Sequence, residues 1–290
     1  MLKYFSILFF ISLIFISCQK EINVKLPPYN PKVVIEGWIE PGQSAMVLVT
    51  RNAAYFSTTD SASLVNLLVR NAIIKVSDGV QTDSLTLGLD LRYFPPLVYK
   101  GQKIKGETGK SYTLSVTVDG KTYSAITSIL KPVTLDSVWF KLDPSDQDTF
   151  GLIWAKFSDP PGIANYYRIF TQRLNKDKKF IPVEGSVSDD KLFDGKTFSF
   201  SMRRGSNNLA STQKNSTEKS GKFKIGDTVI IKACTIDKAN YDFWRTTEQE
   251  MYNGGNPFGS PIPIISNIKD ALGVWGGYGP FFDTLIIKKN

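Results

Sequence analysis

Apolar and polar residues alternate with a period of two along much of the chain, as in β-strands that bury one face. The clearest example is SYTLSVTVDGKTYSAITSIL (111–130), whose two arms alternate around Asp119-Gly120. An Asp-Gly pair supplies the positive φ angles of a two-residue type I′ turn, so this stretch predicts a β-hairpin. The runs at 32–40 and 44–51, with Pro41-Gly42 between them, predict two more strands.

Two sets of such strands divide the chain. About seven short runs between residues 33 and 131 predict a β-sandwich of the immunoglobulin or transthyretin type. Lys131-Pro132 is the predicted domain junction, and further strand-like runs follow it within residues 132–290. The expected fold is therefore mostly β, with two sandwich-like domains.

The hydrophobic period changes once, in DKANYDFWRTTEQEMYN (237–253), where apolar residues recur at roughly helical spacing. Asp237 is a suitable N-cap, and Asn253-Gly254-Gly255 is a typical helix end. The pattern predicts one substantial helix over about residues 237–252, near the C-terminus.

The N-terminus is apolar and short. Met1–Ile16 carries one basic residue, Lys3, and its apolar part would rise about 20 Å as a helix, against roughly 30 Å for a bilayer core. This pattern predicts a signal peptide over residues 1–17. The segment FISC (15–18) resembles a bacterial lipobox, which predicts cleavage before Cys18 and acylation of that residue. An ordinary signal peptide with a chance cysteine is the alternative.

A tether is predicted over residues 18–32, which contain three prolines and several charges. Its first polar residues, Gln19, Lys20 and Glu21, resemble the signal that routes many Bacteroidota lipoproteins to the outer face of the outer membrane. A solvated tether would have a similar composition. We expect an outer-membrane protein held by its lipid, with the body on the cell-surface side.

Composition narrows the chemistry. The chain has no histidine, which excludes Ser–His and Cys–His nucleophile activation and the commonest zinc ligand. No pair of carboxylates stands out, so no catalytic residue and no cofactor are predicted. The net charge is +8, with basic residues interleaved with acidic ones, and nucleic acid is not an expected partner. Cys234 lies in an apolar strand pattern and is expected to be a buried, inert thiol.

An acidic cluster occurs in LDPSDQDTFG, at Asp143, Asp146 and Asp148. Their oxygens are candidate calcium ligands, but the spacing does not match an EF-hand loop. A solvated loop between strands is the favoured interpretation.

Glycines and aromatic residues alternate in LGVWGGYG (272–279), which contains Trp275 and Tyr278. Glycine allows close backbone approach, and aromatic rings offer flat faces to sugars, peptides or lipids. One interpretation is a tight turn whose aromatic residues cover the edge of the core. The other is a ligand or docking surface, completed by Trp244 and Tyr252 of the predicted helix.

The whole mature chain resembles a Bacteroidota lipoprotein family catalogued as domain of unknown function 4249. The similarity is carried by residues 18–56, by VRNAIIKVSDG (69–79), by FSDPPGIANYYRI (157–169) and by NPFGSPIPIISNIKDALGVWGGYG (256–279). Family members are often encoded beside TonB-dependent transporters, which implies a surface accessory role in nutrient capture. The resemblance supplies no enzymatic residues.

Three functions are therefore carried forward. The leading one is a non-catalytic, lipid-anchored binding protein that works beside a TonB-dependent β-barrel transporter. The second is a structural or adhesive surface lipoprotein without a transporter. The third is a histidine-free hydrolase, which would need a cleft with two facing carboxylates.

Overall fold

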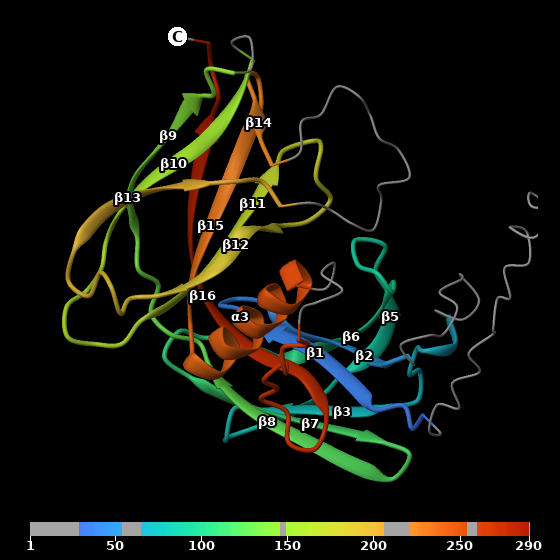
Figure 1. Cartoon of the computed structure of the whole chain (residues 1–290). Helices are drawn as coiled ribbons and strands as arrows, with labels where there is room; N and C mark the ends of the chain where they lie inside the picture. Colours follow the sequence, from blue (N-terminus) through green and yellow to red (C-terminus); the bar gives the residue numbers. More distant parts are fainter. Residues whose placement is uncertain (1–28, 54–64, 146–148, 206–220, 254–259, 290) are drawn as a thin grey trace, which may run out of the picture. The chain divides into compact units, whose positions relative to one another are not determined.

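The computed structural model describes residues 29–53, 65–145, 149–205, 221–253 and 260–289. Contacts divide the chain into Met1–Pro31 and a compact unit, Lys32–Asn290, to which all the named strands belong. Strands predominate, and helix α3 (Lys238–Asn253) lies near the C-terminus, so the predicted mostly β fold is confirmed (Figure 1). None of the helices in the described part of the chain has the length and apolar character of a membrane span.

An eight-stranded sheet runs through the compact unit. Its strands, in spatial order, are β12 (Ile181–Asp189), β11 (Tyr166–Arg173), β15 (Thr228–Ile236), β16 (Leu272–Ile286), β1 (Val33–Ile39), β2 (Ser44–Arg51), β6 (Leu97–Lys105) and β5 (Thr86–Leu89). Strands β1 and β16 are parallel, with Gly37 opposite Trp275. A strand near the C-terminus thus pairs with the first strand and joins the early and late parts of the chain in one sheet.

Two smaller sheets complete two sandwiches. The first contains β4 (Thr82–Ser84), β3 (Ile73–Ser77), β7 (Ser111–Val118) and β8 (Lys121–Ser128). The second contains β9 (Leu135–Leu142), β10 (Phe150–Ser158), β13 (Thr197–Met202) and β14 (Phe223–Lys224). The hairpin predicted around Asp119-Gly120 joins β7 to β8, and the φ angles of 49° and 79° are those of the expected turn.

Each sandwich has its own apolar core, and both cores lie on one face of the large sheet. Trp275 of β16 belongs to the N-terminal core, whereas Phe281 and Leu285 pack against the C-terminal core. Alternate residues of a strand share a face, so these three side chains point to the same side. Strand β16 therefore contributes to both cores, and Ile268, which precedes it in the chain, also belongs to the N-terminal core.

The chain passes from the first core to the second just after β8, close to the predicted junction. The connection crosses β16 where that strand has glycines. A Cβ atom added to Gly277 would lie 2.4 Å from the carbonyl oxygen of Ser128, and one added to Gly279 would lie 2.0 Å from that of Leu130. The glycine-rich segment is thus an extended strand with a gap for the crossing chain, and the predicted tight turn is not observed there.

Candidate functional site

Helix α3 is fixed to the sheet by its first turn. As predicted, Asp237 caps the helix: its carboxylate accepts a hydrogen bond from the backbone nitrogen of Asn240 at 2.8 Å. The same carboxylate accepts a hydrogen bond from the Thr127 hydroxyl at 2.5 Å, which ties the helix start to β8. Asn240 packs over Gly276 of β16, where a Cβ atom would lie 2.5 Å from its side-chain nitrogen. The helix therefore lies on the face opposite the two cores.

A buried polar network holds the middle of the helix. The Tyr278 hydroxyl accepts hydrogen bonds from Trp244 at 3.0 Å and from Arg168 at 2.9 Å. Burial raises the pKa of Tyr278, although Arg168 lowers it, so the phenol stays protonated at neutral pH. Trp244 and Tyr278, two residues predicted for a binding surface, are thus brought together. They form a hydrogen bond with each other inside the protein and do not form a surface for a ligand.

Arg168 supplies the positive charge of this network. Its side chain is buried, and its guanidinium carbon lies 3.4 Å from the centre of the Trp244 ring. Its Nε atom donates to the Ser186 hydroxyl at 3.3 Å, and no carboxylate of the described residues forms an ion pair with it. Cation–π contact and hydroxyl acceptors therefore compensate its desolvation, and the network stabilises the contact between helix and sheet.

Trp275 lies on the other face of β16 and has a different environment. Its side chain has no exposed surface, and its indole nitrogen donates to the backbone oxygen of Tyr112 at 2.9 Å. With Trp275 in the N-terminal core and Tyr278 in the buried network, neither ring faces solvent. Trp275 and Tyr278 therefore do not form part of an exposed aromatic surface. The glycines beside them let other parts of the chain, such as Ser128 and Asn240, pack closely against β16. Trp244 is half-buried, and Tyr252 is 69% exposed.

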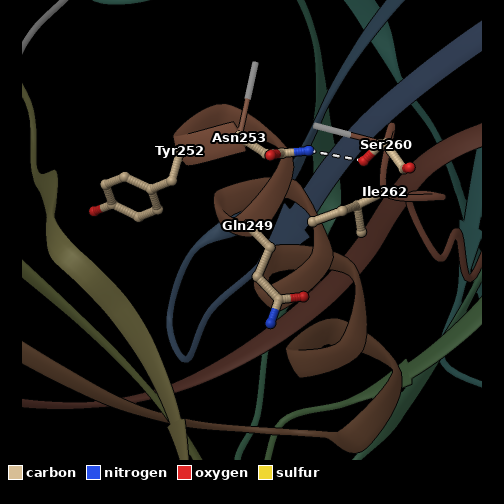
Figure 2. A pocket seen from close by; sticks show the side chains of 5 residues that line it. All are labelled: Gln249, Tyr252, Asn253, Ser260 and Ile262. Carbon is tan, nitrogen blue, oxygen red and sulfur yellow. Dashed lines mark hydrogen bonds between the residues drawn. The ribbon is translucent and has the colours of Figure 1, made fainter. Parts of the chain in front are cut away.

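Exposed apolar side chains lie in the last turn of α3 and in the segment that runs back beside the helix. Asn253 donates from its side-chain amide to the Ser260 backbone oxygen at 2.8 Å, which brings the following segment back to the helix. Tyr252 and Asn253 from the helix and Ile262 from that segment frame a shallow hollow, shown in Figure 2. The α3 patch is defined here as the exposed residues Met251, Tyr252, Ile264 and Ile265.

The segment beside the helix is anchored rather than loosely placed. Its backbone nitrogen at Ile262 donates to the Glu250 carboxylate at 2.7 Å, and the one at Ile265 donates to the Thr246 hydroxyl at 3.0 Å. Thr246 itself is buried in the helix. The α3 patch is thus a set of apolar side chains on a well-supported surface.

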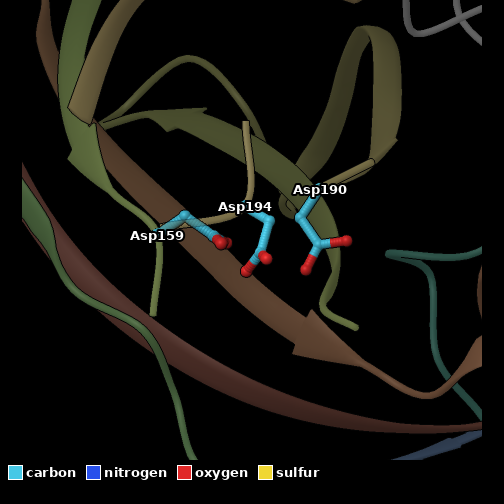
Figure 3. A group of neighbouring side chains, drawn as sticks. All are labelled: Asp159, Asp190 and Asp194. Atoms are coloured by element: carbon cyan, nitrogen blue, oxygen red, sulfur yellow. The ribbon is translucent and has the colours of Figure 1, made fainter. Parts of the chain in front are cut away.

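Three carboxylates meet at one end of the C-terminal sandwich (Figure 3). Asp159 follows β10, and Asp190 and Asp194 lie between β12 and β13; their oxygens lie within 4.8 Å of one another. Sequence reasoning missed this cluster because its members come from two loops and carry no motif spacing.

Local donors already occupy each carboxylate of that cluster. Tyr167 donates its hydroxyl proton to Asp159 at 2.5 Å, and burial together with Asp159 raises the pKa of this phenol. The backbone nitrogen of Asn165 donates to Asp190 at 2.6 Å, and that of Gly162 donates to Asp194 at 2.7 Å. These hydrogen bonds give the three carboxylates a structural role: they hold together the loops at one end of the sandwich.

The acidic cluster identified from the sequence, Asp143, Asp146 and Asp148, is only partly described by the structure. Asp143 forms an ion pair with Lys222 at 2.6 Å, and its carboxylate also accepts from the Ser145 hydroxyl at 2.8 Å. The hydrogen bond from Lys222 lowers the pKa of Asp143 well below its usual range. Asp146 and Asp148 lie outside the described residues, so the favoured solvated loop and its alternative, a calcium site, both stay untested at those positions.

The two cysteines differ in what the structure shows. Cys234 is a free, buried thiol in β15, and burial raises its pKa to about 12, so it is protonated and inert at neutral pH. Cys18 and the predicted export signal Gln19, Lys20 and Glu21 lie outside the described residues, and their roles stay predictions.

The C-terminal sandwich also encloses a cavity of about 180 Å³, which sequence reasoning did not identify.

A family model described as "Domain of unknown function (DUF4249)" matches residues 19–281. That range covers both sandwiches, helix α3 and most of β16. None of the curated proteins is similar enough to the chain to count as a match.

Proposed function

The chain belongs to the DUF4249 family, and from that premise we propose that it is a lipid-anchored, non-catalytic binding protein of the outer membrane. The body docks onto a membrane partner, a TonB-dependent β-barrel transporter, and assists nutrient capture. The observation that carries this proposal is the α3 patch, an apolar surface on a helix that the rest of the fold holds in place.

The anchor rests on the N-terminal pattern. An apolar segment followed by Cys18 supports cleavage and acylation, and several acyl chains give firm anchoring where a single chain gives marginal binding. Gln19, Lys20 and Glu21 support export to the cell surface. Confinement to the membrane raises the effective concentration of the protein near a membrane partner without additional contact area.

The α3 patch has the chemistry of a docking surface. Tyr252 is 69% exposed and Met251 is 67% exposed, and both residue types are enriched in protein interfaces. Ile264 and Ile265 are exposed on the adjoining segment and supply further apolar area. Because the cap at Asp237 and the Tyr278 network fix the helix, the patch would lose little conformational entropy on binding.

A co-purification experiment tests the docking. The tagged protein is extracted from native membranes in mild detergent, and bound proteins are identified by mass spectrometry. The variant Met251→Ser/Tyr252→Ser removes apolar area from the patch, and Ile163→Ser/Leu192→Ser is the matched control, since these loop residues are 66% and 87% exposed. We expect the wild type and the control to retain a β-barrel transporter and the patch variant to lose it.

Two results would contradict the proposal. Equal recovery of the transporter by the patch variant and the control would remove the α3 patch as the docking surface. A wild-type extract without any β-barrel protein would favour the structural or adhesive lipoprotein instead. Circular dichroism of each variant checks that its fold is intact.

A further inference from the structure

The C-terminal sandwich contains a cavity that the proposed docking surface does not use. The cavity of about 180 Å³ is enclosed between β9, β10 and β13 on one side and β11, β12 and β15 on the other. Its inner wall is mainly aromatic and aliphatic. Phe157, Phe198 and Tyr167 line it, and Phe157 contacts the other two rings edge to face at centroid distances of 5.8 and 4.9 Å.

The cavity reaches solvent between two strands that do not pair with each other. Strand β12 is an edge of the large sheet, and β13 is an edge of the four-stranded sheet. The exposed lining residues all lie on these two strands: Glu184, Gly185, Ser188 and Ser201. The gap between the edge strands is therefore the mouth of the cavity.

Contacts close the sandwich at both ends of this mouth. At one end the backbone nitrogen of Glu184 donates to the Arg203 oxygen at 3.0 Å, and their side chains form an ion pair at 2.8 Å. At the other end the connection from β12 to β13 itself joins the two strands, and the backbone nitrogen of Gly195 within it donates to the Asp159 carboxylate at 3.1 Å. The two edge strands are thus connected at both ends of the mouth, and the space between them stays open in the middle.

The polar groups of the site are placed at the mouth. Ser188 is opposite Tyr167 in the strand register, so it lies on the side of β12 that faces the cavity. Among the described residues, the hydroxyl of Ser188 has no hydrogen-bond partner. It can bond the polar end of a molecule whose apolar part lies inside. Ser201 has its side chain on the outer face of β13, opposite to the buried Met202.

We propose that this cavity binds a small molecule with one aromatic ring, or an alkyl chain of similar volume, and a single hydroxyl-like polar end at the Ser188 mouth. Native cores contain few voids larger than a water molecule, so a space of about 180 Å³ is unusual for packing alone. Water needs about two to four polar partners in a buried site, and the aromatic inner wall does not offer them. An apolar cavity of about 150 Å³ is known to stay dry and to bind benzene.

Benzyl alcohol is the probe, because it has one ring and one hydroxyl. The purified chain is melted at increasing benzyl alcohol concentration, and affinity is measured by calorimetry. 1-Pyrenemethanol has the same end group on four fused rings and serves as the oversized probe. We expect saturable binding and a rising melting temperature with benzyl alcohol, and neither with 1-pyrenemethanol.

Two serine variants locate the site. Ser188→Phe obstructs the mouth, whereas Ser199→Phe places the same ring on the exposed outer face of β13, opposite Lys156. We expect Ser188→Phe to weaken benzyl alcohol binding at least tenfold and Ser199→Phe to leave it within twofold. Ala233→Leu fills the cavity from β15 and is expected to abolish binding; if it fails to fold, the serine pair decides.

The proposal is overturned if wild-type protein shows no saturable binding of benzyl alcohol, or if both serine variants bind it equally well. It does not depend on the α3 patch, so failure here would leave the docking proposal intact, and failure of docking would leave the cavity site intact.

Discussion

Replacing Gly279 with alanine tests how the two sandwiches are joined. An added Cβ atom would lie 2.0 Å from the Leu130 oxygen and 3.0 Å from its carbon, and the crowding atoms are backbone, which cannot rotate away. Overpacking of this kind lowers the free energy of unfolding by roughly 1–3 kcal/mol. Alanine also restricts the unfolded chain more than glycine does, which raises the free energy of unfolding by up to about 1 kcal/mol. We expect Gly279→Ala to lower the free energy of unfolding by roughly 2 kcal/mol.

The assay is urea unfolding followed by tryptophan fluorescence and by circular dichroism, which must give coincident transitions for one free energy to apply. Gly88→Ala is the matched control, because the nearest atom to its added Cβ is the Val98 oxygen at 4.0 Å. We expect the control to change the free energy of unfolding by less than about 1 kcal/mol. If Gly279→Ala is as stable as Gly88→Ala, the crossing of the chain over β16 is not as close as described.

Three further substitutions test the core, the network and the buried thiol. Trp275→Ala should cost about 3–5 kcal/mol in urea unfolding, because a large core side chain and its bond to Tyr112 are lost. Tyr278→Phe should cost about 1–3 kcal/mol and speed amide hydrogen exchange in α3, since Arg168 and Trp244 lose a buried acceptor; unchanged exchange would contradict this. The pKa of the Cys234 thiol is raised from 9.0 to about 12, so the unfolded chain releases this proton first as pH rises. Above about pH 9, wild-type stability should therefore fall faster than that of Cys234→Ala, by about 1.4 kcal/mol per pH unit, and parallel urea-midpoint curves would refute it.

Local chemistry was predictable from the sequence where a few neighbouring residues decide the structure. The Asp119-Gly120 turn and the Asp237 cap both follow from backbone preferences that act within one turn of chain. The predicted helix, over about residues 237–252, differs from the observed α3 by one residue at each end. The mostly β fold followed from the alternation in the same way.

The glycine-rich segment shows where such reasoning ends. Its glycines predicted close backbone approach, which is observed, but the approaching groups come from the Ser128–Leu130 connection and from α3. Those partners are distant in sequence, and the parallel pairing of β1 with β16 leaves no local signal. The same holds for the Asp159 cluster and for the cavity, which exist only after two loops or two sheets meet. A docking surface at Trp275 and Tyr278 is one of the two interpretations that the sequence allows, and in the structure both residues are buried.

The membrane location depends on the state of Cys18, and mass analysis of the protein from native membranes tests it most directly. The account predicts an N-terminal peptide that begins at Cys18 and carries acyl chains, with the preceding residues removed. A peptide with an unmodified Cys18, or one that still contains Met1–Ser17, would contradict the lipid anchor and the docking built on it.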